Sequence, residues 1–82
     1  MSILALAALE PQQNAVVTAL DLEFAVRERL AALGVRIGRT LLVVRRAGSS
    51  GPLQVRIGHT DLILRRSEAD RIQVSILAAA AT

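Results

Sequence analysis

Alternation of apolar and polar residues is the clearest pattern in the second half of the chain. Over residues 53–57 and 72–76, Leu, Val and Ile alternate strictly with polar side chains. Successive side chains of a β-strand point to opposite faces, so each segment predicts a strand with one buried and one solvated face. Three less regular segments are rich in Val, Leu, Ile and Thr and are also expected to be strands; they are residues 14–20, 40–44 and 62–65.

A single helix is predicted over residues 22–33. Val26, Leu30 and Leu33 recur at the i, i+4, i+7 spacing of one helical face. Asp21 is the expected N-cap, and Gly34 supplies the residue without a Cβ that a left-handed helix stop needs. The spacing places Leu30 in the core. The alternative, left open here, is that Leu30 lies at the margin of a narrow buried stripe and is free for docking.

Shorter features complete the expected fold. A turn of helix over residues 6–11 closes at a proline, a loop over residues 45–52 joins two strands, and Ser67 caps a helical turn over residues 67–70. The alanines at 78–81 are expected to fray. Five or six short strands with one inserted helix predict a mostly β protein, a small closed barrel with the helix across one opening, because closure removes exposed strand edges. The whole chain, residues 1–82, is expected to be one domain.

A family resemblance lies in residues 29–40, RLAALGVRIGRT. The run of a basic residue, Leu, two variable positions, Leu-Gly and an apolar position resembles the signature of FeoA, the small ferrous iron transport protein A. Ile37 stands where that family usually has proline before Gly38. The resemblance continues through residues 64–69 and covers nearly the whole chain. It implies an SH3-like fold and a non-enzymatic accessory role in bacterial ferrous iron uptake.

The composition argues against several kinds of chemistry. The chain has 82 residues, no cysteine and a net charge of +3, with ten cations that are all arginine. Phe24 is the single aromatic residue. Barrels that bind single-stranded nucleic acid stack bases on aromatic side chains, and SH3 grooves for proline-rich peptides have aromatic walls. The sequence therefore predicts neither nucleic-acid binding nor such a groove. The sequence has no nucleophilic cysteine, no glycine-rich phosphate loop and no Ser/His/Asp spacing, so an enzyme is not expected.

Metal chemistry rests on one histidine. His59 and Asp61 lie at i, i+2 on a predicted turn, and two such groups do not complete a coordination shell. We expect no bound metal or cofactor. The apolar residues 2–9 have no cationic segment before them and stop at Glu10-Pro11, and no apolar run approaches the ~20 residues that cross a bilayer. A cytoplasmic protein without membrane insertion is expected.

The resemblance implies a partner, FeoB, the membrane ferrous iron transporter with a cytosolic GTPase domain, which the protein would bind and modulate. A helix lying over a barrel leaves Arg27, Arg29 and Arg36 accessible to an acidic surface, with Leu30 as the desolvated contact. The candidate partner-binding residues are Arg27, Arg29, Leu30, Arg36 and Pro52.

Two other functions stay open at this stage. The chain could be a detached relative of the SH3-like domain of iron-dependent repressors. It could also be a general protein-interaction module in an unrelated complex.

Overall fold

The computed structural model describes residues 3–77. Six antiparallel strands carry most of the chain, with one α-helix of more than a single turn inserted between the second and third strands. In chain order the elements are β1 (Ile3–Ala5), the 3-10 turn η1 (Leu6–Ala8), β2 (Asn14–Leu20), α1 (Phe24–Ala32), β3 (Thr40–Arg46), β4 (Leu53–Ile57), β5 (Thr60–Leu64), α2 (Arg66–Ala69) and β6 (Ile72–Ile76).

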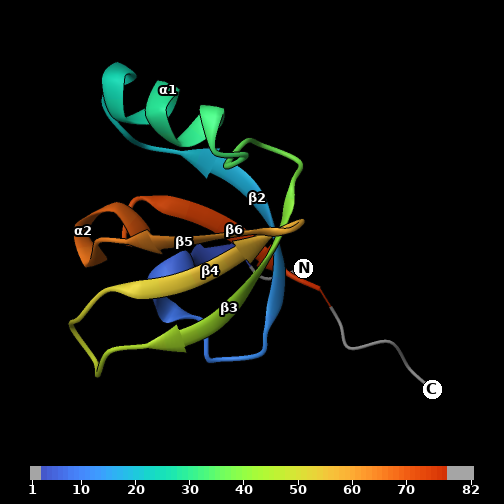
Figure 1. Cartoon of the computed structure of the whole chain (residues 1–82), viewed down its shortest axis with the longest axis vertical. Coiled ribbons are helices and arrows are strands. Elements are labelled where there is room, and N and C mark those ends of the chain that lie inside the picture. The colour runs from blue at the N-terminus through green and yellow to red at the C-terminus, as the bar shows by residue number, and fades with distance from the viewer. Residues whose placement is uncertain (1–2, 78–82) are drawn as a thin grey trace.

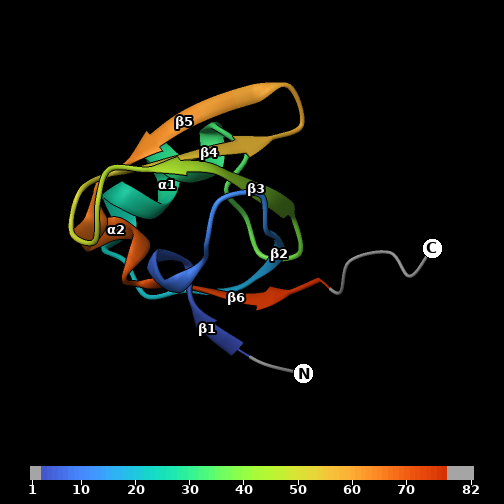
Figure 2. The ribbon, with the colours of Figure 1, turned by 90° about the horizontal axis from the view of Figure 1, so that it is seen from below.

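The strands form one sheet in the order β1-β6-β2-β3-β4-β5, which curls around a common interior (Figures 1 and 2). Register shifts between Val17 and Ala19 in β2 and between Val43 and Arg45 in β3 mark the irregularities that let the strands bend. The mostly β architecture is confirmed. The expected full closure is wrong, because in the described part of the chain β1 and β5 each pair with one neighbour and not with each other.

Inward-facing side chains of the strands make the core. Val17, Val43, Val55 and Val74 come from four different strands and are at most 1% exposed. The turn η1 and the helix add Leu6 and Leu30, so aliphatic side chains fill the interior without any aromatic residue. The alternation seen in the sequence is therefore the alternation between this interior and solvent, except at Ser75, which was expected on the solvated face of β6 and is buried.

The predicted strands match closely. The boundaries of β2, β4 and β6 are those expected, β3 runs two residues beyond residue 44, and β5 spans Thr60–Leu64 instead of residues 62–65. Strand β1 was not predicted, because its three residues precede η1 without a readable alternation. The alanines at 78–81 lie outside the described residues.

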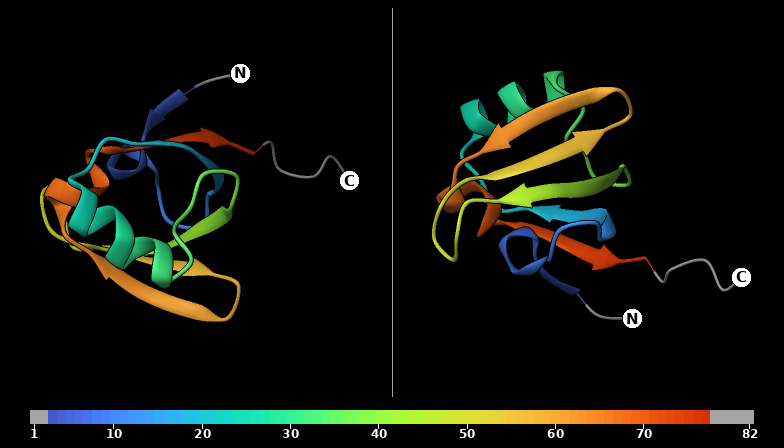
Figure 3. Two further views of the ribbon diagram at one scale, coloured as in Figure 1. Left: turned by 90° about the horizontal axis from the view of Figure 1, so that it is seen from above. Right: turned by 60° about the horizontal axis from the view of Figure 1, so that its bottom comes forward.

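The helix differs from the prediction at its start. It begins at Phe24, its N-cap is Glu23 and no side chain caps it. Asp21 is not the cap, because its backbone N–H donates to Arg71 O at 2.9 Å and its carboxylate lies 3.5 Å from the Arg71 guanidinium. Seen from above, α1 lies across one end of the curled sheet, as predicted (Figure 3).

The short helix α2 also has a different cap from the one expected. Its N-cap residue is Arg65, and Ser67 lies inside the helix. The Glu68 carboxylate accepts the Arg65 backbone N–H at 3.1 Å, which satisfies one free donor of the first turn. Glu68 also accepts a hydrogen bond from Arg29, so the same side chain links α2 to α1.

Candidate partner-binding surface

Only a narrow face of α1 is buried against the core. Leu30 is 2% exposed and is the buried residue of the helix, while Val26 is half-buried against the core. Arg27, Glu28 and Arg29 are exposed. Most of the helix surface is therefore available to solvent, as the sequence predicted for its arginines.

A docking role for Leu30 would require this side chain to be exposed, but the exposed leucine at this end of the helix is Leu33. Leu30 is a core residue, so in this conformation it is not a surface contact. Leu33, which the helical spacing assigned to the core, is 44% exposed. Leu33 is the C-cap, with φ −93° and ψ 0°, and a residue that has left helical geometry no longer follows the helical spacing. The exposed apolar residue of this helix end is thus Leu33.

A second exposed aliphatic side chain follows in the next turn. Ile37 is 59% exposed and occupies the position after Arg36. The Arg36 Nε donates to the Ala31 carbonyl at 3.0 Å, which holds the arginine stem over the end of the helix. Gly34 and Gly38 have φ values of +103° and +92°, a region that costs strain for residues with a Cβ. These glycines allow the two turns, at residues 33–34 and 37–38, that lead from α1 to β3.

Backbone hydrogen bonds fix this turn to β2. The Gly38 N–H donates to Val17 O at 2.8 Å, and the Val17 N–H donates to Arg39 O at 3.0 Å. A Cβ placed on Gly34 would lie 3.9 Å from an Arg39 Nη, so the Arg39 side chain lies beside the helix stop. We call this region the corner surface; it comprises Arg29, Leu33, Arg36, Ile37 and Arg39.

The charge of the corner surface is positive. Arg29 pairs with Glu68, whose side chain is 13% exposed. In residues 3–77, Arg36 and Arg39 form no ion pair with a carboxylate. Two unpaired guanidinium groups beside two exposed aliphatic side chains are suited to an acidic surface with an apolar centre.

Pro52 lies apart from these residues. It is exposed in the loop that joins β3 to β4, whereas the corner surface precedes the start of β3, at the opposite end of that strand. Pro52 lines a separate groove of about 300 Å³ with Arg45 and Ile63 among its walls. The structure therefore divides the predicted partner-binding residues between two places.

Asp61 is engaged in a cross-strand ion pair. The Arg56 Nε donates to Asp61 Oδ1 at 2.7 Å and its Nη2 donates to Oδ2 at 3.1 Å, and Gln54 donates to Oδ2 at 3.0 Å. The hydrogen bond from Arg56 holds the pKa of the Asp61 carboxyl below its usual value. His59 is exposed on the β4–β5 turn. Across the described residues, no three His, Cys, Asp or Glu side chains come together as a metal site.

No helix in the described part of the chain is long and apolar enough to cross a membrane.

Another pocket, of about 530 Å³, lies between the start of α1 and α2. Its walls carry both signs of charge, with Glu23 and Arg65 among them, over Leu22 and Val26. Mixed charge on these walls gives no preference for an anion or a cation.

Comparison with known proteins identifies the family. The FeoA domain matches residues 4–76. The FeoA protein of Chlorobium tepidum has a similar structure, with a TM-score of 0.86, 40% identity, and coverage of 92% of this chain and 71% of that one. Stenotrophomonas maltophilia FeoA, crystallised with zinc and described as an SH3 domain protein, gives a TM-score of 0.75 and 34% identity, covering 88% of this chain and 89% of that one.

A manganese-dependent transcriptional repressor shares the fold alone, with a TM-score of 0.83 at 22% identity over 94% of this chain and 38% of the repressor. Among curated protein sequences none matches the chain. The family match and the structures at 34% and 40% identity confirm the SH3-like fold and the predicted resemblance. The chain belongs to the FeoA family, whose members are non-enzymatic accessory domains associated with ferrous iron transport.

Proposed function

We propose that this protein is a cytoplasmic accessory protein of ferrous iron uptake that docks on the cytosolic part of a FeoB-like transporter through its corner surface. The family match supports the association with iron transport. The observation that carries the choice of surface is the exposure of Leu33 and Ile37 beside arginines without ion pairs.

Apolar contact supplies the affinity at such a surface. Leu33 and Ile37 are 44% and 59% exposed, so a partner that covers them removes aliphatic surface from water. Leu30 contributes indirectly, because its burial anchors the helix that presents Arg27, Arg29 and Leu33. Interfaces depend on a few desolvated anchors of this kind, surrounded by polar groups that set orientation.

Charge supplies the orientation. Arg36 and Arg39 project from the same turn, and Arg29 lies one helical turn before Leu33. An acidic patch on the partner would be drawn to these guanidinium groups and would fix the register of the contact. The turn is held to β2 by two backbone hydrogen bonds, so little ordering is needed when the partner binds.

A repressor-type function has less support. The repressor likeness, at 22% identity, concerns the fold. Phe24 is 77% exposed on α1, and it is the single aromatic residue of the sequence, which leaves no stacking platform for bases. The corner surface thus favours a protein partner.

Affinity capture from native membranes tests the proposal. The tagged protein should retain a FeoB-like transporter, and the double variant Leu33→Ser, Ile37→Ser should lose it. The variant Phe24→Ser is a matched control, because Phe24 is an exposed apolar residue at the start of α1, outside the corner surface. Capture of the transporter by the double variant at the level of the unmodified protein contradicts the proposal.

A further inference from the structure

A groove of about 300 Å³ lies on the outer face of the sheet, between the loop joining β3 to β4 and the exposed side of β5. It is far along the sheet from the corner surface, at the other end of β3. Its walls are formed by Arg45, Arg46, Ala47, Pro52, Leu53, Gln54 and Ile63.

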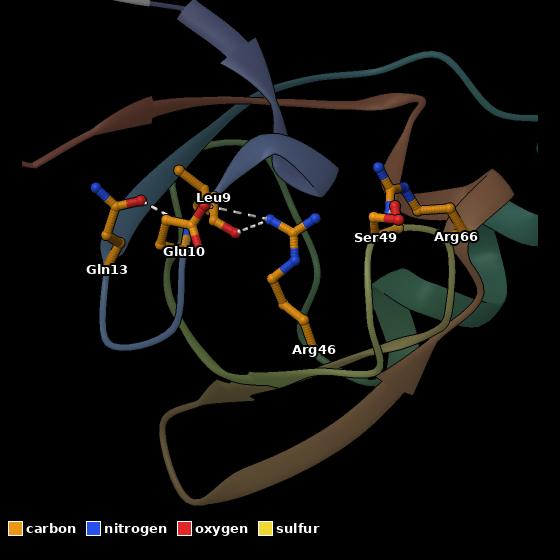
Figure 4. Close-up of polar contacts among 6 residues, drawn as sticks. All are labelled: Leu9, Glu10, Gln13, Arg46, Ser49 and Arg66. Carbon is orange, nitrogen blue, oxygen red and sulfur yellow. Dashed lines mark hydrogen bonds and ion pairs between the residues drawn. The ribbon is translucent and has the colours of Figure 1, made fainter.

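Contacts around the loop hold the groove in shape. The Ala47 N–H donates to Pro52 O at 3.0 Å, and a Cβ added to Gly51 would lie 2.1 Å from Ala47 O, so the loop backbone is tightly packed against itself. On the far side of the loop, Arg66 of α2 donates to the Ser49 carbonyl (Figure 4). The groove is therefore formed before any partner arrives.

Arg46 is likewise held in place. Its Nη1 donates to the Leu9 carbonyl at 2.7 Å, and the Glu10 carboxylate lies 3.9 Å away, so the arginine ties the end of β3 to the chain after η1 (Figure 4). Arg46 is also one of the residues that line the groove. Arg45 is exposed and, within residues 3–77, forms no ion pair.

The chemistry of the walls selects one kind of ligand. Ile63 is 67% exposed, and Ala47 and Pro52 are further apolar residues of the groove wall. The charged wall residues are both arginines, and no carboxylate is among the walls. An occupant should therefore bring aliphatic side chains for Ile63 and Pro52 and negative charge for Arg45.

We infer that this groove is a second docking site, which binds a short segment of a partner protein that combines aliphatic and acidic side chains. The inference goes beyond the proposed function, since it concerns a different surface and does not depend on the identity of the partner at the corner. The absence of aromatic residues from the walls argues against a proline-rich ligand and against nucleic acid.

The test uses the isotope-labelled full chain and blocked heptapeptides followed by amide chemical shifts. The probe alternates glutamate with leucine. Two control peptides of equal length alternate lysine with leucine and glutamate with serine. We expect the glutamate–leucine peptide to shift amides of residues 45–51, 53, 54 and 63 with a Kd on the order of 1 mM or tighter, because the contact is small. Both control peptides should bind at least about tenfold more weakly.

Matched variants assign the effect to the groove. Ile63→Ser and Arg45→Glu should each weaken binding by about tenfold. Ile37→Ser removes an aliphatic side chain of similar exposure at the corner surface and should leave the peptide affinity unchanged. Because Ile63 and Arg45 point to solvent, unchanged thermal unfolding of these variants should confirm that the fold is intact.

Several outcomes overturn the inference. They are shifts confined to residues outside the groove, equal binding of the lysine–leucine peptide, unaltered affinity of Ile63→Ser, or tighter binding of a single-stranded thymidine decamer than of the acidic peptide. The two proposals can fail separately. Ile37→Ser tests the corner surface through transporter capture, whereas Ile63→Ser tests the groove through peptide binding, so each result is assigned to one surface.

Discussion

Leu30 and Leu33 are three residues apart, yet Leu30 is 2% exposed and Leu33 is 44% exposed. The difference arises because α1 ends at Ala32 and Leu33 is its C-cap. One leucine therefore anchors the helix to the core and the other is presented at the corner surface.

Truncation of these two leucines should affect stability unequally. Leu30→Ala removes a fully buried side chain and should lower the free energy of unfolding by about 2–5 kcal/mol. Leu33→Ala should cost about 1 kcal/mol or less, because much of that side chain is already in water. Denaturant unfolding of both variants measures the difference. Equal losses would mean that both leucines belong to the core.

The loop joining β3 to β4 should depend on Gly51. A Cβ at this position would lie 2.1 Å from Ala47 O, so Gly51→Ala must displace the loop backbone and should cost about 1–3 kcal/mol. Ser50→Ala, at an exposed neighbouring position, is the control and should be close to neutral. Amide chemical shifts should change over residues 45–51, 53 and 54 in the glycine variant. An unaltered spectrum and stability would contradict the close packing.

Glu68 should contribute more to the free energy of unfolding than an ordinary surface glutamate does. Its carboxylate accepts the Arg65 backbone N–H and pairs with Arg29, and its side chain is 13% exposed. Glu68→Ala should lower the free energy of unfolding by about 1–2 kcal/mol through loss of the cap and of the link between the helices. Glu28→Ala, at an exposed position of α1, should change it by less than about 0.5 kcal/mol. Thermal or urea unfolding of the Glu68→Ala and Glu28→Ala variants measures this difference, and equal losses of stability would contradict the role of Glu68.

The Asp61–Arg56 pair should make the stability of the fold depend on pH in the acid range. The hydrogen bond from Arg56 lowers the pKa of Asp61 in the folded protein, so folding is favoured by the pair above the unfolded pKa of about 3.9. This contribution is lost as the pH falls through the folded pKa. Asp61→Asn should therefore be less stable than the unmodified protein at pH 7, and the two should converge in acid. A carboxyl carbon of Asp61 that titrates at or above 3.9 by NMR would contradict the assignment.

Much of the sheet could be predicted because burial alternates along its strands. Residues 53–57 face the interior at every second position, Ile72 and Val74 do the same in β6, and the predicted boundaries of β4 and β6 hold. The pattern does not predict Ser75, which is buried although it was expected on the solvated face. Gly34 was recognised as the helix stop, and its φ of +103° gives the physical reason. Three-residue β1 has too few positions for an alternation to be seen, and its pairing with β6 is a long-range contact.

The functional surfaces were harder to predict from the sequence. Helical spacing assigned Leu33 to the core because the pattern does not show where helical geometry ends. Ile63 could not be singled out either, because an apolar run such as residues 62–64 does not tell which side chain faces out. The groove needs Pro52 from the loop before β4 and Ile63 from β5, and their proximity depends on the pairing of β4 with β5.

Binding of the purified cytosolic domain of a FeoB-like transporter to corner variants tests the central claim most directly. We predict that Leu33→Ser and Ile37→Ser each weaken the equilibrium Kd by about tenfold or more, that Arg36→Glu slows association most strongly at low salt, and that Ile63→Ser leaves the affinity unchanged. Thermal unfolding of every variant should remain close to that of the unmodified protein. Full affinity in the variants of Leu33, Ile37 and Arg36 would contradict the assignment of the corner surface as the transporter-binding site.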